Sequence, residues 1–189
     1  RYIRACMNDD KSLIKGCIKG DRKSQRVLYE RYSERLFVVS MRYCRSDQEA
    51  EDVLQESFIK IYNKIDSFRG ESSLFYWMKR VLVRTALNHQ RSKLYMYPMV
   101  DVANISMSMD ERVSLADFRL EELMAMIRKL PAGCSVIFNL YAIEGYTHKE
   151  VAEMLEISEG TSKSQYSRAR SLLQEMIINE NKVSYGTGR

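Results

Sequence analysis

The sequence predicts an all-α protein made of two small helical domains joined by a flexible linker. Apolar residues recur over most of the chain at the i, i+3, i+4, i+7 spacing of amphipathic helices. The chain holds only 2 Pro and 8 Gly, which favours helices with short connections. Residues 94–116 lose the helical period, and a loop of that length within one compact domain would be unusual. We therefore expect domains at 9–93 and 117–178, with the linker at 94–116.

Composition excludes several classes of protein. Hydrophobic residues make up 45% of the 189 residues, which is enough for packed cores. No apolar run reaches the roughly 18 residues that span a membrane, and the N-terminus has no apolar segment of a signal peptide. We expect a cytoplasmic protein without membrane insertion. The 4 Cys and 2 His are scattered without a CxxC pair, which predicts free thiols and no metal site. We expect no cofactor.

Two helices are expected to open the first domain. The first runs from about Asp9 to Gly20, where Gly20 ends it and Asp21 caps the next helix. The second continues to about Arg45. Its expected buried face consists of Val27, Leu28, Tyr32, Leu36, Val39 and Tyr43.

The third predicted helix, from about 47 to 64, is acidic in its first half. Residues 47–56 contain five acids and no base, a local net charge of −5 in a chain whose net charge is +5. The helix macrodipole accounts for Asp47 and Glu49 but not for Glu56, which lies further along the helix. An exposed acidic ridge on a basic protein indicates a docking surface for a basic partner.

The following stretch, up to Lys93, combines a turn, aromatic rings and cations. Phe68-Arg69-Gly70 predicts the turn, and three adjacent aromatics follow at 75–77. From Arg69 to Lys93 there are six bases and one acid, a net charge of +5. Aromatic faces stack on unpaired bases while cations hold phosphates, so the pattern favours a single-strand platform on a helix from about 72 to 91. The alternative is an amphipathic helix with core aromatics and a solvated basic face.

Four further helices are expected in the second domain. The first two are marked by apolar residues at 120–130, ended by Pro131, and at 136–141, stopped by Gly145. Residues 147–150 form a capping box that starts a short third helix. The last helix is predicted from about Glu159 to Ile178, with a frayed tail after Asn179.

The last two helices form a helix-turn-helix candidate. Ala152 is small enough for two helices to approach, and Ile157 places an apolar side chain in the turn. The last helix begins with small polar residues, which let its N-terminus approach phosphates. The alternative is an ordinary helical hairpin.

With both domains considered, the chain resembles the extracytoplasmic-function (ECF) group of bacterial RNA polymerase sigma factors. Four stretches carry the resemblance: GDRKSQRVLYERY (20–32), DQEAEDVLQESFIKIYNKIDSFRGESS (47–73), LPAGCSVIFNLYAIEGYTHKEVAEML (130–155) and ISEGTSKSQYSRARSLL (157–173). The resemblance implies that residues 9–93 are sigma region 2 and residues 117–178 are sigma region 4. It also implies that the linker is extended.

The resemblance implies a role for each candidate surface. Docking on the clamp helices of the largest polymerase subunit is expected from Asp47, Glu49, Glu51, Asp52, Gln55 and Glu56. Reading of the melted −10 element, with a non-template base flipped into a pocket, is expected from Phe68, Arg69, Gly70, Ser72, Ser73, Trp77, Lys79, Arg80, Arg84 and Asn88. Major-groove contact with the −35 element is expected from Ser158, Thr161, Ser162, Lys163, Gln165, Tyr166, Arg168 and Arg170. Further expected partners are the flap of the second-largest subunit and an inhibitory anti-sigma factor.

Three positions depart from the family pattern. Many relatives have Asn where this chain has Arg84, so we expect a different −10 preference. Ser162 stands where relatives often have a hydrophobic residue, and Tyr166 where they often have Leu. Packing is therefore an alternative role for Tyr166.

Three functions would each explain part of this sequence. A stand-alone helix-turn-helix regulator of duplex DNA would explain residues 147–175 but leaves the acidic helix and the aromatic platform without a role. A DNA-cleaving or recombining enzyme would need an activated nucleophile or a metal cluster, and the serines of the last helix have no His or Asp partner in the pattern. We therefore expect a sigma factor that directs promoter-specific initiation on core RNA polymerase and promoter DNA, and that is not itself an enzyme.

Overall fold

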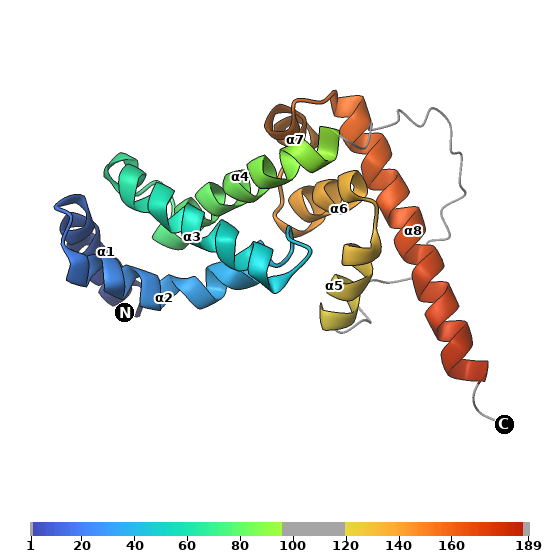
Figure 1. Cartoon of the computed structure of the whole chain (residues 1–189), viewed down its shortest axis with the longest axis horizontal. Coiled ribbons are helices and arrows are strands. Elements are labelled where there is room, and N and C mark those ends of the chain that lie inside the picture. Colours follow the sequence, from blue (N-terminus) through green and yellow to red (C-terminus); the bar gives the residue numbers. More distant parts are fainter. Residues whose placement is uncertain (1, 96–119, 187–189) are drawn as a thin grey trace. The chain divides into compact units, whose positions relative to one another are not determined.

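The computed structural model describes the backbone of residues 2–95 and 120–186, and the side chains of residues 10–90 and 122–179. Every regular element within these backbone ranges is helical, which confirms the all-α fold class (Figure 1). The chain divides into two compact units, Arg1–Arg91 and Ser92–Arg189. The predicted linker lies almost entirely outside the described residues, since only Leu94 and Tyr95 are described, as the end of a helix.

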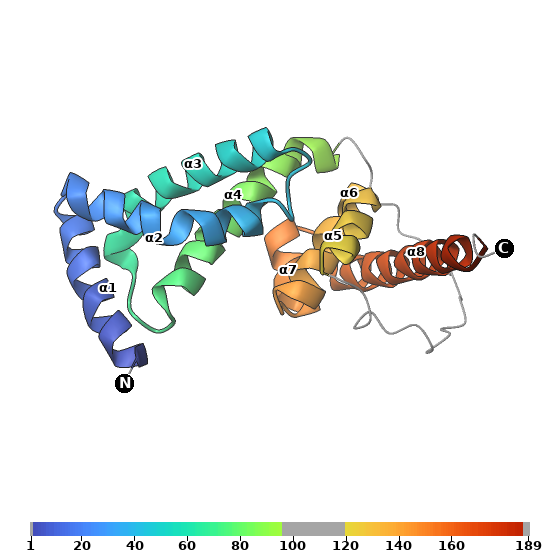
Figure 2. The ribbon, with the colours of Figure 1, turned by 90° about the horizontal axis from the view of Figure 1, so that it is seen from below.

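The described part of the first unit consists of four α-helices and one short 3-10 helix. They are α1 (Tyr2–Ile18), α2 (Arg22–Ser40), α3 (Asp47–Lys64), the short 3-10 helix η1 (Ile65–Ser67) and α4 (Leu74–Tyr95). α1 packs on α2, and α2 and α3 lie side by side (Figures 1 and 2). Leu36, Ile61 and Leu82, one from each of α2, α3 and α4, are completely buried in the core of this unit.

Local chemistry explains where the first helices begin and end. Gly20 adopts a φ of +73°, a conformation that other residues avoid, and so lets the chain turn after α1. Asp21 then caps α2 by accepting hydrogen bonds from the backbone N–H groups of Lys23 and Ser24. A Cβ atom on Gly16 would overlap the Ser24 side chain, so this corner is closed by a direct approach of α1 to α2.

Some helix limits differ from the sequence predictions. α3 spans Asp47–Lys64, which is the predicted range. α2 ends at Ser40 rather than near Arg45, because residues 41–43 form a turn. The predicted buried face of α2 is wrong at Val27, which is 42% exposed. α4 begins at Leu74 rather than at residue 72, and it continues to Tyr95.

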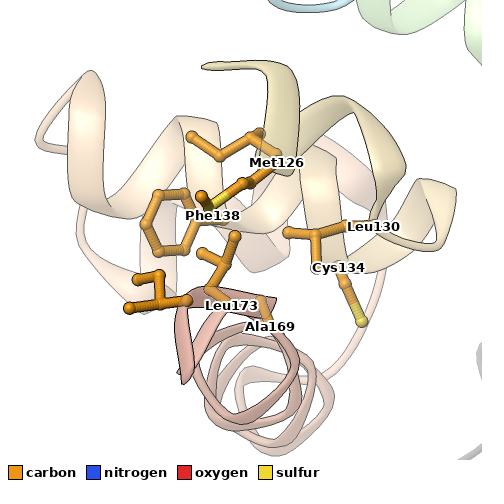
Figure 3. Packing of buried hydrophobic residues seen from close by; sticks show 8 residues of the cluster. Met126, Leu130, Cys134, Phe138, Ala169 and Leu173 are labelled. Carbon is orange, nitrogen blue, oxygen red and sulfur yellow. The ribbon is translucent and has the colours of Figure 1, made fainter. Parts of the chain in front are cut away.

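The described part of the second unit consists of α5 (Leu120–Lys129), α6 (Ala132–Phe138), the π-helical turn η3 (Asn139–Ile143), α7 (His148–Leu155) and α8 (Glu159–Gly186). The predicted capping box at the start of α7 is present. α8 continues to Gly186, whereas the sequence predicted its end near Ile178 and a frayed tail. α5, α6 and α8 share one core (Figure 3), which is formed by Met126, Ile127, Leu130, Cys134, Phe138, Ala169, Leu173 and Ile177.

The described ranges contain neither a membrane-spanning helix nor a metal-binding cluster. None of the helices there has the length and apolarity that a membrane span requires. No group of three or more His, Cys, Asp or Glu side chains within these ranges is arranged to hold a metal ion. Cys17, Cys44 and Cys134 are buried, and none of these three is in a disulfide.

Candidate nucleic-acid interface

The loop before α4 is held against the first turns of that helix by an aromatic pair. The rings of Phe68 and Trp77 meet edge to face with their centroids 5.7 Å apart, and both side chains are half-buried. Gly70, at the tip of the loop, has a φ of +75°. The predicted loop candidates Arg69, Gly70 and Ser73 are exposed, and Ser72 is half-buried. The loop therefore presents polar side chains and backbone beside one fixed aromatic edge.

Helical spacing brings four of the predicted −10 residues onto one face of α4. Trp77, Arg80, Arg84 and Asn88 follow one another at intervals of three or four residues. All of them except the half-buried Trp77 are exposed. We call these four residues the α4 stripe. Lys79 does not belong to it, because two residues advance a helix by about 200° from Trp77, and its Nζ lies 5.1 Å from the ring centroid of Tyr76.

The three adjacent aromatics at 75–77 do not form a buried core. Tyr76 is 56% exposed, while Phe75 and Trp77 are half-buried. Phe75 lies under the guanidinium of Arg35 from α2, at 3.9 Å from Cζ to the ring centroid. The buried side of α4 is formed instead by Leu74, Met78, Leu82, Val83, Thr85, Ala86 and Leu87. The core-aromatic alternative therefore does not describe this helix.

The acidic candidates on α3 separate into an exposed and an engaged group. Asp47, Glu51, Asp52 and Gln55 are exposed. Ile59, one turn after Gln55, is 61% exposed, which is unusual for a large apolar side chain and was missed by the sequence analysis. The helical spacing of residues 51, 52, 55 and 59 could have predicted that Ile59 lies on the same exposed face as the acidic residues. We call these four residues the α3 stripe.

Glu49 and Glu56 are engaged within the first unit. Glu49 Oε2 accepts a hydrogen bond from the backbone N–H of Arg45 at 2.9 Å. Glu56 lies 2.6 Å from Lys60 Nζ and 3.1 Å from Nε2 of His89, which belongs to α4. The hydrogen bond from Lys60 lowers the pKa of Glu56, with a smaller contribution from the nearby His89. Glu56 therefore joins α3 to α4, in addition to any role at the surface.

The second unit presents the first turns of α8 after a tight turn. Glu156 ends α7 in the left-handed conformation, with a φ of 56°. Ser158 precedes α8, and its Oγ accepts a hydrogen bond from the backbone N–H of Thr161 at 2.9 Å. Thr161 itself is only 7% exposed, and its hydroxyl lies 2.8 Å from that of Ser158. These two predicted −35 residues thus build the start of the helix.

Three other predicted −35 residues face into the unit. Ser162 is completely buried, and its Oγ lies 2.9 Å from Nδ1 of His148. The prediction that the serines of this helix have no His partner is therefore wrong at Ser162. Gln165 is 4% exposed and accepts a hydrogen bond from the thiol of Cys134 at 3.0 Å. Tyr166 is half-buried against aromatic neighbours, with its ring centroid 4.6 Å from that of Tyr141. Because these three side chains pack within the unit, we no longer count them among the residues that contact bases.

The outward side of α8 is formed by two adjacent rows of residues. Lys163 and Ser167 form one row, and Ser164 and Arg168 form the other, each four residues apart. Lys163, Ser167 and Arg168 are exposed, and Ser164 is half-buried, as is the predicted contact residue Arg170 one turn further. Neither serine was among the predicted −35 contacts, although their spacing from the basic residues placed them on this side. We call the four residues the α8 surface.

Both units match known families. Residues 28–94 match sigma-70 region 2, and residues 120–173 match sigma-70, region 4. The ECF RNA polymerase sigma-E factor of Haemophilus influenzae is 31% identical over 180 residues, which cover 89% of this chain and 95% of that protein. The sigma-E factor of Escherichia coli K12 is 29% identical, with 89% and 94% covered. The sigma factor RpoE of Bartonella quintana, solved with the anti-sigma factor NepR, has a TM-score of 0.52 at 22% identity, and the match covers 81% of this chain and 96% of that chain.

Proposed function

This chain belongs to the ECF group of RNA polymerase sigma factors, and we propose that its two units divide promoter recognition between them. It is an alternative sigma factor that directs transcription initiation. One observation carries this conclusion, namely that sigma-70 region 2 and region 4 both match, in this order, within one chain. A stand-alone helix-turn-helix regulator would have no place for residues 28–94, so the chain is not such a regulator.

Docking on core polymerase is assigned to α3. The α3 stripe combines the carboxylates of Glu51 and Asp52 with the amide of Gln55 and the exposed apolar side chain of Ile59. Opposite charges steer the encounter of two partners, and an apolar side chain adds area that is buried on contact. These properties suit a basic partner surface, and we assign that partner to the clamp helices of the largest subunit. Asp47 extends the acidic surface, while Glu49 and Glu56 act mainly by holding α3 in place.

The melted −10 element is assigned to the α4 stripe and the loop at 68–73. A flipped base needs a pocket with backbone and polar groups, and the adjoining single strand needs cations for its phosphates. The loop offers backbone and polar groups for the pocket, and Arg80 and Arg84 offer cations for the phosphates. Trp77 lies at the boundary between them, where its ring can stack on a base at the edge of the duplex.

The −35 element is assigned to the α8 surface, with Arg170 at its end. An α-helix fits the major groove of B-form DNA, where Arg and Lys bind guanine edges or phosphates. Ser164 and Ser167 are short hydroxyl-bearing residues that let the helix approach the base edges closely. Ser158, Thr161, Ser162, Gln165 and Tyr166 shape and orient this helix.

The remaining partners are proposed from membership of the family. Polymerase performs the chemistry, so we propose no catalytic residue in this chain. The flap of the second-largest subunit is the expected partner of the second unit. An anti-sigma factor is expected to keep the protein inactive until it is needed, and the cytoplasm is the expected compartment because transcription takes place there.

Run-off transcription with core polymerase tests this division of labour. The double variant Glu51→Lys/Asp52→Lys should lose most core binding, because two favourable charges become repulsive. It should keep duplex binding by the second unit. The control Glu34→Lys/Asp66→Lys makes the same change of charge at exposed positions of the first unit outside α3 and should bind core normally. Equal loss in both variants would indicate a general effect of charge and would reject the docking assignment. A wild-type chain that never directs initiation with core polymerase would reject the function itself.

A further inference from the structure

The first turns of α8 are attached to the rest of the second unit by the buried polar side chains of Ser162 and Gln165 as well as by the ring of Tyr166. The shared core receives Ala169, Leu173 and Ile177 from α8, all of which lie beyond the α8 surface (Figure 3). Among the described residues of α8 before Ala169, the hydrophobic side chain that packs against this core is Tyr166. Dispersion and burial therefore hold residues 169–177 of α8 more firmly than its first turns. The end that carries the α8 surface depends on the buried hydroxyl of Ser162 and the buried amide of Gln165.

His148 is the side chain that receives the buried Ser162. In the neutral ring tautomer with its proton on Nε2, Nδ1 accepts a hydrogen bond from the Ser162 hydroxyl. The Ser162 side chain is inaccessible to water, so loss of this partner would leave a buried polar group unsatisfied. Burial lowers the pKa of His148, and nearby Lys163 lowers it further, which favours the neutral ring.

The same ring is fixed by aromatic neighbours from two other elements. It stacks on Tyr141 of η3 with centroids 4.0 Å apart and an interplanar angle of 13°. It meets Tyr166 of α8 edge to face with centroids 5.8 Å apart. Tyr166 in turn lies 5.9 Å from Phe138, which belongs to the shared core. A single side chain at the start of α7 thus connects η3, α7 and α8.

We propose that His148 is a positioning residue for duplex recognition, which sets the rotation of the first turns of α8 about the helix axis. This inference rests on the proposed −35 role of α8. Ser162 and Lys163 are consecutive, so they point about 100° apart around the helix. Holding Ser162 on His148 therefore fixes the direction of Lys163 and Ser167 toward the groove. A rotation of part of a turn would move both away from the base edges that they are assigned to read.

The two contributions of the imidazole can be separated by substitution. His148→Phe retains a ring for Tyr141 and Tyr166 but removes the nitrogen that Ser162 contacts. Ser162→Ala removes the hydroxyl and leaves the ring unchanged. If both act through the same contact, the double variant should lose no more than either single variant. His148→Asn should restore part of the loss, because its amide can reach the position of Nδ1.

The experiment uses the full chain bound to core polymerase. A duplex enriched by the wild-type holoenzyme from a pool randomised in the −35 region serves as the probe, and a scrambled duplex of the same composition serves as the competitor. We expect His148→Phe and Ser162→Ala each to lower the affinity ratio of probe to competitor by about 10-fold, the value of one lost base contact. The salt dependence of competitor binding should remain unchanged, since phosphate contacts persist. Glu175→Ala, an exposed change on α8 outside the α8 surface, is the control and should keep the ratio.

Three outcomes would overturn the inference. They are an unchanged ratio in either single variant, additive losses in the double variant, and equal losses for probe and competitor. The last would indicate a loss of structure rather than of orientation, and thermal unfolding of each variant measures it independently. If one single variant fails to fold, the affinity ratio of the other single variant tests the inference. Failure of the wild-type holoenzyme to enrich any −35 sequence would instead reject the −35 role itself.

Discussion

Replacing Glu56 with Gln should weaken the contact between α3 and α4 more than it weakens docking. Glu56 contacts Lys60 at 2.6 Å on its own helix and His89 at 3.1 Å on α4, and all three side chains are 34–42% exposed. An exposed i,i+4 ion pair contributes about 0.3–0.5 kcal/mol. A second contact of similar exposure adds a comparable amount. We therefore expect a loss of about 0.5–1 kcal/mol in the free energy of unfolding of the first unit at pH 7.

The fluorescence of Trp77 provides the assay. The chain contains 1 Trp, and it lies in the first unit, so urea unfolding followed by this signal reports that unit alone. Because the folded-state pKa of Glu56 lies below its usual 4.5, its contribution is fully present above pH 4.5 and is lost as the pH falls through the folded-state value. The difference between wild type and Glu56→Gln should therefore shrink in acid. Glu51→Gln, the same change at an exposed position of α3, is the matched control and should alter stability little.

Two results would refute this reasoning. Equal urea midpoints for Glu56→Gln and wild type at pH 7 would show that the bridge contributes nothing to the first unit. A loss of core affinity in Glu56→Gln larger than that in Glu51→Gln would show that Glu56 is itself a principal docking contact. In that case the assignment of docking to the α3 stripe would have to move along the helix.

Three further predictions address separate parts of the molecule. Arg84→Asn should change the preferred −10 sequence in run-off assays while leaving core binding intact, and an unchanged preference would contradict the −10 role assigned to Arg84. Gly70→Ala should destabilise the loop by about 1 kcal/mol, because its φ of +75° disfavours any side chain although the surrounding space is open; native hydrogen exchange in the loop would reveal it. Leu173→Ala should cost about 2–5 kcal/mol in the second unit, measured by thermal unfolding, because Leu173 is 1% exposed in the shared core.

The fold was largely predictable because its signals are local. The period of apolar residues gave α3 its limits, and the capping serine at its start is a sequence neighbour, with Ser46 Oγ accepting from the backbone N–H of Glu49. The capping box before α7 is equally local. The position of Lys79 outside the α4 stripe could also have been predicted from spacing alone, because Lys79 is two residues from Trp77.

Burial of polar residues at the start of α8 could not be predicted in the same way. Ser162 and Gln165 follow a turn and belong to residue types that are usually exposed. Their burial depends on His148 and Cys134, which lie 14 and 31 residues earlier in the sequence. The engagement of Glu56 likewise depends on His89, a residue of another helix. Contacts between elements decide such positions, and no local pattern contains them.

The turn of α4 at residues 75–77 has a consequence for how this region can vary in evolution. Consecutive side chains there serve different neighbours, with Phe75 directed to Arg35 of α2 and Trp77 to Phe68 of the preceding loop. An insertion or deletion of one residue in this turn would exchange those neighbours by rotating every later side chain by about 100°. The loop tip at Gly70 carries no such constraint, since nothing lies within 4 Å of a Cβ built there. Differences in length among relatives should therefore accumulate at the tip and be absent between Leu74 and Trp77.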